Sequence, residues 1–505
     1  MSSIIELIRK SASEHPDLIA ISSGDNKLSY RELLEGIDNA ATNILASGAL
    51  PGDKFLYAAK QTPQSMCLAL GFIKAGLTLA FVDPFTSDEL FKSRVDMVQP
   101  KWTLANPLLY TIGRKALSPA RKIKSLTIAD FSSAATNNLY TGGRWLPGVP
   151  LSAKSVDNWL KIPGFPVENL LERDENEESV IVFTSGTTSD PKGVVHTSAS
   201  LAANVFAFAK RFGMSSGQVI YSEPMTLGVT ALSVGAEWKI PQKGEIVPDC
   251  DVYFAVPTEV VEALDKLEEL FIDDRPNVKI VGTGAAPVLP SLVKRIYSVL
   301  GKKTKVLGVY GMTEMLPIAI VDGKQKLEYS EGDLVGTLIG DAKVKIADDG
   351  EVLIQGSGLM KSYLGKEPQE WHPTGDIGKM VGPRKLALLG RKKNMFIRGN
   401  MNIYPGLYEP ALSSIEGVSQ AIMVGLDDYY GDDYIVLAVT PEDSSVNKET
   451  LRQRVNKEMS RHVDGDAVPD KVIVIDKMPV SGRALKINRD ELKELMIKEL
   501  SNENN

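Results

Sequence analysis

The residues with the clearest chemical potential lie between positions 184 and 192. Glycine, hydroxyl side chains and a lysine are combined there as Thr184, Ser185, Gly186, Thr187, Thr188 and Lys192. Glycine lets backbone N–H groups turn inward, and the hydroxyls add further donors. Such a loop can wrap an oxyanion, to which a lysine adds positive charge. It is not the usual P-loop, because that motif runs Gly-Lys-Ser/Thr into a helix, whereas a strand pattern follows Lys192.

A second distinctive segment follows the strand pattern Val306–Val309. It reads Tyr310, Gly311, Met312, Thr313 and Glu314. The Tyr310 ring can stack on a base, the Thr313 hydroxyl can donate to a phosphate, and the Glu314 carboxylate can bind Mg²⁺. Open α/β sheets bind ligands at the carboxyl ends of their strands, so this segment is a candidate nucleotide site.

Small residues and one carboxylate mark two more turns. The strand pattern Asn277–Val281 leads into a turn that contains Gly284, Ala285 and Ala286. Side chains this small let a flat ring approach the backbone closely. Farther along, Asp376 ends the sequence Thr-Gly-Asp. Its ionised carboxylate has acceptors only, which suits the binding of hydroxyl groups.

Composition narrows the class of protein. A chain of 505 residues is too long for one core, so two or more domains are expected. The net charge, 57 − 64 = −7, gives no basic field for nucleic acid. Only Cys67 and Cys250 are present, which fits a reducing compartment. The apolar stretch Leu68–Val82 is interrupted by Lys74, and Glu6 comes too early for a signal peptide. We therefore expect a cytoplasmic protein with no integral membrane segment and no nucleic-acid partner.

Strand and helix patterns alternate along the first part of the chain. Ser29 and Glu32 form a capping-box pattern at the start of a helix. The strand pattern Lys54–Ala59 is followed by the helix pattern Thr62–Ala75. This alternation predicts a parallel α/β architecture. Residues 84–178 are the least informative, and we assign them no chemistry.

Taken in this order, the motifs resemble those of the adenylate-forming superfamily, which contains acyl- and aryl-CoA synthetases, peptide-synthetase adenylation domains and firefly luciferase. An AMP-binding acyl-CoA synthetase is the most similar type. The resemblance implies an α/β fold in two parts. Residues 1–390 would form a large N-terminal ATP- and acyl-binding domain with α/β sheets and a small β-barrel. Residues 391–505 would form a small, mobile α+β C-terminal domain that carries the catalytic lysine.

The same resemblance implies a reaction and its residues. A carboxylic acid reacts with ATP to give acyl-AMP and pyrophosphate, and the acyl group then passes to a thiol, with CoA as the expected acceptor. The residues implied to be catalytic are Lys486, Thr313, Glu314 and Lys192. The residues implied to bind ATP are Thr184, Ser185, Gly186, Thr187, Thr188, Lys192, Gly284, Ala285, Ala286, Tyr310, Gly311, Met312, Thr313, Asp376, Arg391 and Lys486. Glu314 is the implied ligand of Mg²⁺, and Lys393 the implied pivot of the C-terminal domain.

Three positions depart from the family pattern. Leu227 stands where an aromatic or histidine often borders the acyl pocket, and its apolar neighbours favour an apolar acyl group. Asn400 replaces a glycine found in CoA-using relatives, and Leu485 precedes Lys486 where glycine is usual. Arg483 is the alternative cation in the terminal motif.

Other acceptors and one other class of function remain open. The acyl group could pass to an acyl carrier protein. It could also pass to an internal hydroxyl, as in the β-lactone synthetases, which Thr313–Ile318 resembles. A catalytically silent nucleotide-binding regulatory protein is the alternative outside enzymes.

Overall fold

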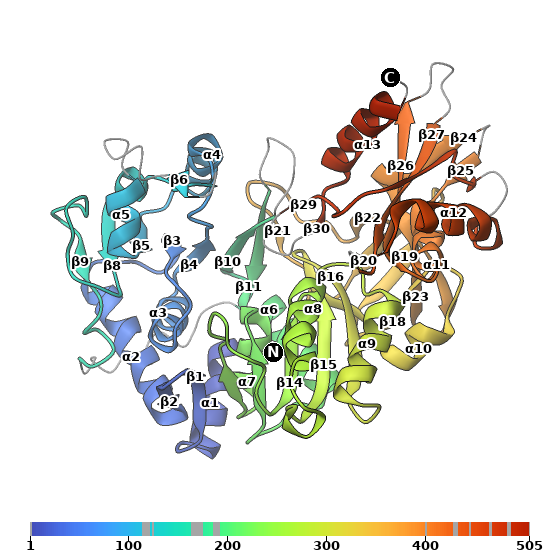
Figure 1. Cartoon of the computed structure of the whole chain (residues 1–505). Coiled ribbons are helices and arrows are strands. Elements are labelled where there is room, and N and C mark those ends of the chain that lie inside the picture. Colours follow the sequence, from blue (N-terminus) through green and yellow to red (C-terminus); the bar gives the residue numbers. More distant parts are fainter. Residues whose placement is uncertain are drawn as a thin grey trace.

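The structure is a computed structural model of the chain (Figure 1). It describes residues 3–113, 122–123, 126–162, 175–184, 192–398, 401–427, 433–443, 446–463, 467–481 and 486–503. Among the described helices, none has both the length and the apolar character needed to cross a bilayer.

The larger of two main sheets joins thirteen of the described strands. In spatial order they are β19 (Lys343–Ile346), β20 (Glu351–Gln355), β22 (His372–Gly382), β23 (Lys385–Arg391), β18 (Asp333–Leu338), β17 (Met315–Asp322), β16 (Lys305–Met312), β15 (Val278–Gly284), β14 (Cys250–Ala255), β12 (Val219–Ser222), β13 (Glu237–Lys239), β1 (Ile19–Ser23) and β2 (Asn26–Ser29). The strands from β16 to β1 run parallel, whereas those from β17 to β19 pair antiparallel.

The smaller main sheet has eight described strands. In spatial order they are β21 (Ser362–Tyr363), β11 (Gly193–Thr197), β10 (Glu178–Phe183), β4 (Thr78–Phe81), β3 (Lys54–Ala58), β5 (Trp102–Ala105), β8 (Asn137–Tyr140) and β9 (Lys154–Ser155). The short pair β6 (Lys122–Ile123) and β7 (Leu126–Thr127) lies apart from it.

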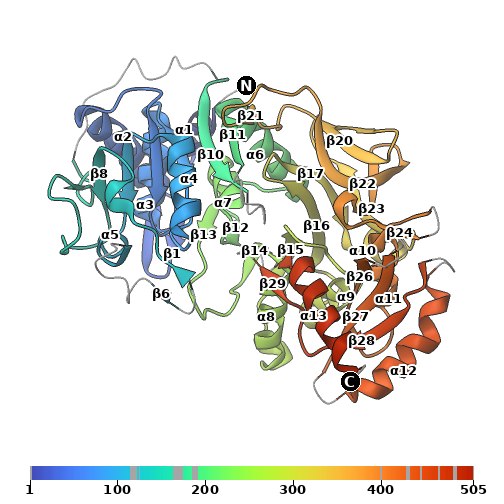
Figure 2. The same ribbon diagram turned by 90° about the horizontal axis from the view of Figure 1, so that it is seen from above.

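Helices cover these sheets and lie between them (Figure 2). They are α1 (Ile4–Glu14), α2 (Tyr30–Ala46), α3 (Pro63–Lys74), α4 (Asp88–Val98), α5 (Pro107–Gly113), α6 (Ser198–Phe212), α7 (Met225–Ser233), α8 (Pro257–Glu268), α9 (Pro290–Leu300) and α10 (Gly323–Glu328), with 3₁₀ turns η2 (Phe131–Ser133) and η4 (Ile272–Asp274). One continuous apolar core includes Phe55 of the smaller sheet, Phe208 of α6 and Trp238 of the larger sheet, so the two sheets share a core.

Most of the predicted elements are present. Ser29 caps α2 and Glu32 closes the capping box, as the sequence predicted. The strands predicted as a small barrel correspond to β18, β19 and β20, and they continue the antiparallel end of the larger sheet. The prediction that a strand ends at Val309 is wrong. β16 runs on to Met312 because it pairs antiparallel with β17, which leaves Thr313 and Glu314 as the turn of a hairpin.

The chain after residue 391 forms sheets and cores of its own, above the yellow strands in Figure 1. Its elements are η5 (Lys392–Asn394), β24 (Phe396–Arg398), β25 (Met401–Ile403), η6 (Pro405–Leu407), α11 (Glu409–Leu412), β26 (Val418–Asp427), β27 (Asp433–Pro441), α12 (Lys448–Glu458), η7 (Met459–Arg461), β28 (Lys471–Val474), β29 (Val480–Ser481), β30 (Lys486–Ile487) and α13 (Arg489–Glu503). The division into residues 1–390 and 391–505 stays a prediction.

A charged pair fixes α13 against α11 and β26. Both carboxylate oxygens of Glu409 accept from Arg489 Nη2 at 2.7 Å, and Arg489 Nη1 donates to the Met423 carbonyl at 2.7 Å. Glu409 is buried, so its charge depends on this partner. Arg489 therefore ties α13 to α11 and β26.

We expect Arg489→Ala to lower the free energy of unfolding by about 3 kcal/mol, because it leaves a buried carboxylate unpaired. The double variant Arg489→Met with Glu409→Leu should be less destabilised than Arg489→Ala. Urea unfolding followed by circular dichroism measures both. A double variant at least as unstable as Arg489→Ala would contradict this account.

Candidate active site

A buried carboxylate lies at the centre of the predicted nucleotide site. Asp376 of β22 is only 3% exposed. Its Oδ2 accepts from the Tyr310 hydroxyl at 2.6 Å, and its Oδ1 lies 2.6 Å from Arg391 Nε. Burial raises the pKa of Asp376, while Arg391 and the Tyr310 hydroxyl act in the opposite direction. Three predicted residues from β16, β22 and β23 therefore meet at one point.

Local backbone structure orients this carboxylate. Gly375 has φ +72°, a conformation that L side chains rarely adopt, and it re-aims the strand just before Asp376. The Asp376 N–H donates to the Thr374 hydroxyl at 3.1 Å, and Arg391 Nη1 donates to the Thr374 carbonyl at 3.2 Å. The sequence predicted a Thr-Gly-Asp turn here, whereas the structure has these residues inside β22 because they pair with β20 and β23.

The hairpin turn of Thr313 and Glu314 faces the smaller sheet. His196 Nε2 lies 2.8 Å from the Thr313 carbonyl oxygen. The Tyr363 hydroxyl donates to Glu314 Oε1 at 2.6 Å. Glu314 is 5% exposed, so the protein holds both its backbone and its side chain. Gly311, just before this turn, leaves room for Leu316, whose side chain would lie 2.6 Å from an added Cβ.

The phosphate-loop residues are described only at the two ends of the loop. The Thr184 N–H donates to the Lys192 carbonyl at 3.2 Å, which closes the base of the loop. Lys192 Nζ lies 5.1 Å from the centre of the Tyr363 ring. Ser185, Gly186, Thr187 and Thr188 lie outside the described residues, as do Asn400 and Arg483.

The predicted adenine-edge turn is tightly packed. A Cβ added at Gly284 would meet the Val309 carbonyl oxygen at 2.5 Å, so only glycine fits at that point. Ala285 follows with φ 66°, which is unusual for a residue with a side chain. Ala285 is exposed and Ala286 half-buried, so this edge faces outward from the sheet.

Lys486 of β30, in the C-terminal part, lies within electrostatic range of this site. Burial and then the neighbouring Arg391 lower the pKa of Lys486, while Asp376 and Glu314 act in the opposite direction. The side chain keeps a solvent-exposed surface, yet enough protein surrounds it for partial desolvation. Its ammonium therefore shares an electrostatic environment with the carboxylates of the nucleotide site.

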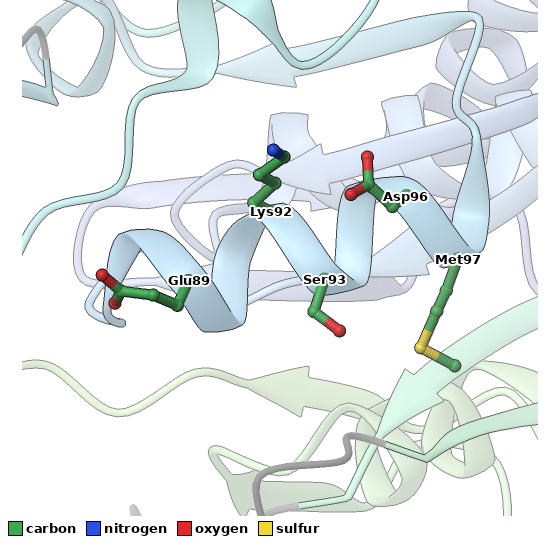
Figure 3. Close-up of a pocket in the computed structure, with 5 residues that line it drawn as sticks. All are labelled: Glu89, Lys92, Ser93, Asp96 and Met97. Atoms are coloured by element: carbon green, nitrogen blue, oxygen red, sulfur yellow. The ribbon is translucent and has the colours of Figure 1, made fainter.

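Two further features lie apart from this cluster. Leu227 of α7 is 1% exposed and belongs to the shared apolar core. A hollow of about 520 Å³ follows one face of α4 and is lined by Glu89, Lys92, Ser93, Asp96 and Met97 (Figure 3). None of these lining residues belongs to the predicted site, although Glu89, Lys92 and Asp96 carry charge.

Comparison with known proteins identifies the family of the chain. Residues 8–364 match the family model described as AMP-binding enzyme, which covers well over half of the chain. The chain belongs to the AMP-binding enzyme family. The matched region includes Lys192, Thr313 and Glu314, and Asp376 and Lys486 lie beyond it.

Relatives of this AMP-binding enzyme are named as CoA ligases and as a lactone synthetase. "Probable CoA ligase CCL9" from Humulus lupulus is 26% identical over 98% of this chain and 97% of its own length. The oxalate–CoA ligase of Arabidopsis thaliana is 24% identical over 94% of this chain and 95% of its own length. The olefin beta-lactone synthetase of Stenotrophomonas maltophilia is 24% identical over 82% of this chain and 84% of its own length.

Solved structures share the fold of this AMP-binding enzyme. An amide bond synthetase from Marinactinospora thermotolerans superposes with a TM-score of 0.78 at 18% identity and covers 98% of this chain and 100% of its own. An o-succinylbenzoate CoA synthetase from Bacillus subtilis gives a TM-score of 0.74 at 18% identity over 96% and 97% of the two chains. The predicted α/β fold of the adenylate-forming superfamily is therefore confirmed.

Sequence reasoning missed His196, Tyr363 and Thr374 as members of the site. His196 directly follows the phosphate-loop segment, so its position was a usable signal. Tyr363 gave no such signal, because it reaches Glu314 only through the pairing of β21 with β11.

We expect Ala285→Gly to raise the free energy of unfolding by about 1 kcal/mol, because it relieves a left-handed alanine. Ala286→Gly is the matched control, since Ala286 does not have a positive φ, and it should lower stability by a similar amount. Denaturant unfolding of the three proteins measures these changes. Equal destabilisation by both substitutions would show that Ala285 is not strained.

Proposed function

We propose that this enzyme joins a carboxylic acid to AMP from ATP, releases pyrophosphate, and then transfers the acyl group to a thiol, with CoA as the leading acceptor. The observation that carries this proposal is the convergence of Tyr310 and Arg391 on the buried carboxylate of Asp376, in a chain that matches the AMP-binding family model. Lys486 of the C-terminal part lies within electrostatic range of Asp376, Glu314 and Arg391, and its cation would act there on the reacting carboxylate and the α-phosphate.

In the first half-reaction, a carboxylate oxygen of the acid attacks the α-phosphorus of ATP. The bond from that phosphorus to the bridging oxygen breaks, and pyrophosphate leaves with the electron pair. A carboxylate needs no deprotonation, so the protein must mainly position the reactants and neutralise charge. Lys486 would bridge the carboxylate and the α-phosphate, while Lys192, Thr184 and Thr313 would hold the phosphates.

Asp376, Tyr310 and Arg391 would bind the nucleoside. The carboxylate of Asp376 has two oxygens with spare lone pairs beyond the contacts to Tyr310 and Arg391, so it can also accept from ribose hydroxyls. The flat edge formed by Gly284 and Ala285 is suited to adenine, because little side chain separates the backbone from a ring there.

Glu314 would bind Mg²⁺, which supplies positive charge at the departing pyrophosphate when bound. Oε1 is held by Tyr363, whereas Oε2 has no protein donor among the described contacts and can face a cation. Within the described part of the chain, no group of three or more His, Cys, Asp or Glu side chains could hold a metal by itself. One carboxylate together with substrate phosphates is a usual arrangement for Mg²⁺.

The class of acid and the acceptor are inferred from the composition of α7 and from the names of relatives. The apolar character of α7 favours an apolar acyl group, and a relative named as a long-chain-fatty-acid–CoA ligase from Bacillus subtilis is 23% identical over 88% of this chain. We propose that the reaction belongs to fatty acid metabolism and takes place in the cytoplasm. The lactone synthetase relative favours an internal hydroxyl as the alternative acceptor. An acyl carrier protein is a second alternative acceptor. Outside enzymes, the alternative function is that of a non-catalytic nucleotide-binding protein.

We expect Lys486→Ala to reduce carboxylate-dependent exchange of labelled pyrophosphate into ATP by about 10²–10³-fold, because it removes a charge that stabilises the transition state. The acids tested should run from acetate to long-chain, aryl and 3-hydroxy acids. Lys498→Ala, an exposed lysine on α13, is the matched control and should exchange normally. ATP binding without exchange by the wild type, for every acid, would support the non-catalytic alternative.

We expect Lys393→Pro to preserve pyrophosphate exchange and to block acyl transfer to the thiol, because proline fixes φ at the proposed pivot in η5. Lys393→Ala keeps the backbone free and should support both half-reactions. Single-turnover transfer from preformed acyl-AMP to CoA measures the second step. Normal transfer by the proline variant would rule out Lys393 as the pivot.

A further inference from the structure

The turn of Thr313 and Glu314 is held from outside by one pair of strands. β11 and β21 pair antiparallel, with Val194 opposite Tyr363 and Val195 opposite Ser362. These strands belong to the smaller sheet, whereas the turn belongs to the larger one. The contacts of His196 and Tyr363 therefore bridge the two main sheets.

The hydrogen bonds of His196 define its protonation. The Thr313 carbonyl can only accept, so Nε2 carries the proton and donates across the 2.8 Å contact. In the neutral imidazole Nδ1 is then an acceptor, and the Ser200 hydroxyl, 3.0 Å away, can donate to it instead of to the Thr197 carbonyl, its other acceptor at 3.1 Å. Burial lowers the pKa of His196, which favours this neutral form. His196 is 4% exposed and is thus a fixed donor to the backbone of the turn.

Tyr363 holds the side chain of the same turn. Its hydroxyl donates to Glu314 Oε1 at 2.6 Å, and the Met360 N–H donates to the Glu314 carbonyl at 2.7 Å. The Tyr363 ring is itself restrained, since His372 packs against it edge-on with ring centres 5.8 Å apart. Lys192 Nζ lies 5.1 Å from the ring centre.

The strand β11 links these contacts to Lys192, the lysine at the end of the phosphate loop. Lys192 directly precedes β11, and His196 lies near its other end. Tyr363 lies beside the same strand and also borders Lys192. One contact on the turn is therefore made from β11, which follows the phosphate loop directly, and the other is made from β21, which pairs with β11.

We infer that His196 and Tyr363 are positioning residues that hold the Thr313–Glu314 turn in a fixed place relative to Lys192. This inference rests on the proposed function, because it assumes that Glu314 and Lys192 act on the same triphosphate. His196 sets the backbone of the turn and Tyr363 sets the direction of the Glu314 carboxylate. Neither residue contacts the reacting atoms.

The Tyr363 contact is tested by Tyr363→Phe, which keeps the ring and removes only the hydroxyl. Binding of Mn²⁺ to the enzyme–ATP complex, followed by electron paramagnetic resonance, should weaken by about tenfold, as is usual when a support of a metal ligand is lost. Tyr221→Phe is the matched control, because its hydroxyl also donates to a glutamate, Glu245, at 3.3 Å and lies elsewhere. Equal Mn²⁺ affinity in wild type and Tyr363→Phe would overturn the role of Tyr363.

The His196 contact is tested by comparing His196→Leu with His196→Gln. Glutamine can direct an amide N–H to the Thr313 carbonyl, whereas leucine cannot. The leucine variant should lose about tenfold or more in the kcat of pyrophosphate exchange, and the glutamine variant should recover most of it. Rates are expressed per folded molecule, so that a loss of stability alone does not count.

The outcomes separate this inference from the proposed function. No exchange by the wild type would reject the proposed function itself. Normal exchange by the wild type, with His196→Leu and His196→Gln equally active or equally impaired per folded molecule, would leave that function intact and overturn the role of His196.

Discussion

The site depends on how the protein keeps a carboxylate inside itself. Burying the charge of Asp376 is costly unless hydrogen bonds and an opposite charge compensate for it. Tyr310 and Arg391 provide both, one to each oxygen. Arg391 comes from β23, which follows β22 after a short turn, whereas Tyr310 comes from β16, much earlier in the sequence. The carboxylate therefore acquires both partners only when the strands from β16 to β22 have assembled. The raised pKa of Asp376 shows that burial outweighs this compensation. Part of the desolvation cost of the carboxylate therefore stays uncompensated, which is typical of a group that binds a ligand.

The sequence predicted much of the fold because the relevant signals are local. Capping residues mark the start of α2, and glycine marks the end of α6 with φ 66° at Gly213, since both act within one turn of a helix. The length of β16 could not be predicted in this way. Its last residues extend because β17 offers partners, and no residue within β16 encodes that pairing.

The residues of the candidate site show the same contrast between local signals and tertiary structure. Asp376, Tyr310 and Arg391 were predicted from their motifs, and the structure brings them together. Tyr363 was not predicted, because its role follows from the pairing of two strands that are distant in the sequence. A motif thus identifies residues that would touch the ligand, whereas residues that orient those groups depend on tertiary structure.

The shortness of β11 has a consequence for how such an enzyme can change. A strand rises about 3.3 Å per residue, so a five-residue strand spans a nearly constant distance between Lys192 and His196. Loops before and after it can gain or lose residues without altering that span. An insertion within β11 would instead turn His196 toward the opposite face of the sheet. The strand therefore works as a spacer of fixed length, and changes of length in the surrounding loops would leave the span from Lys192 to His196 unaltered.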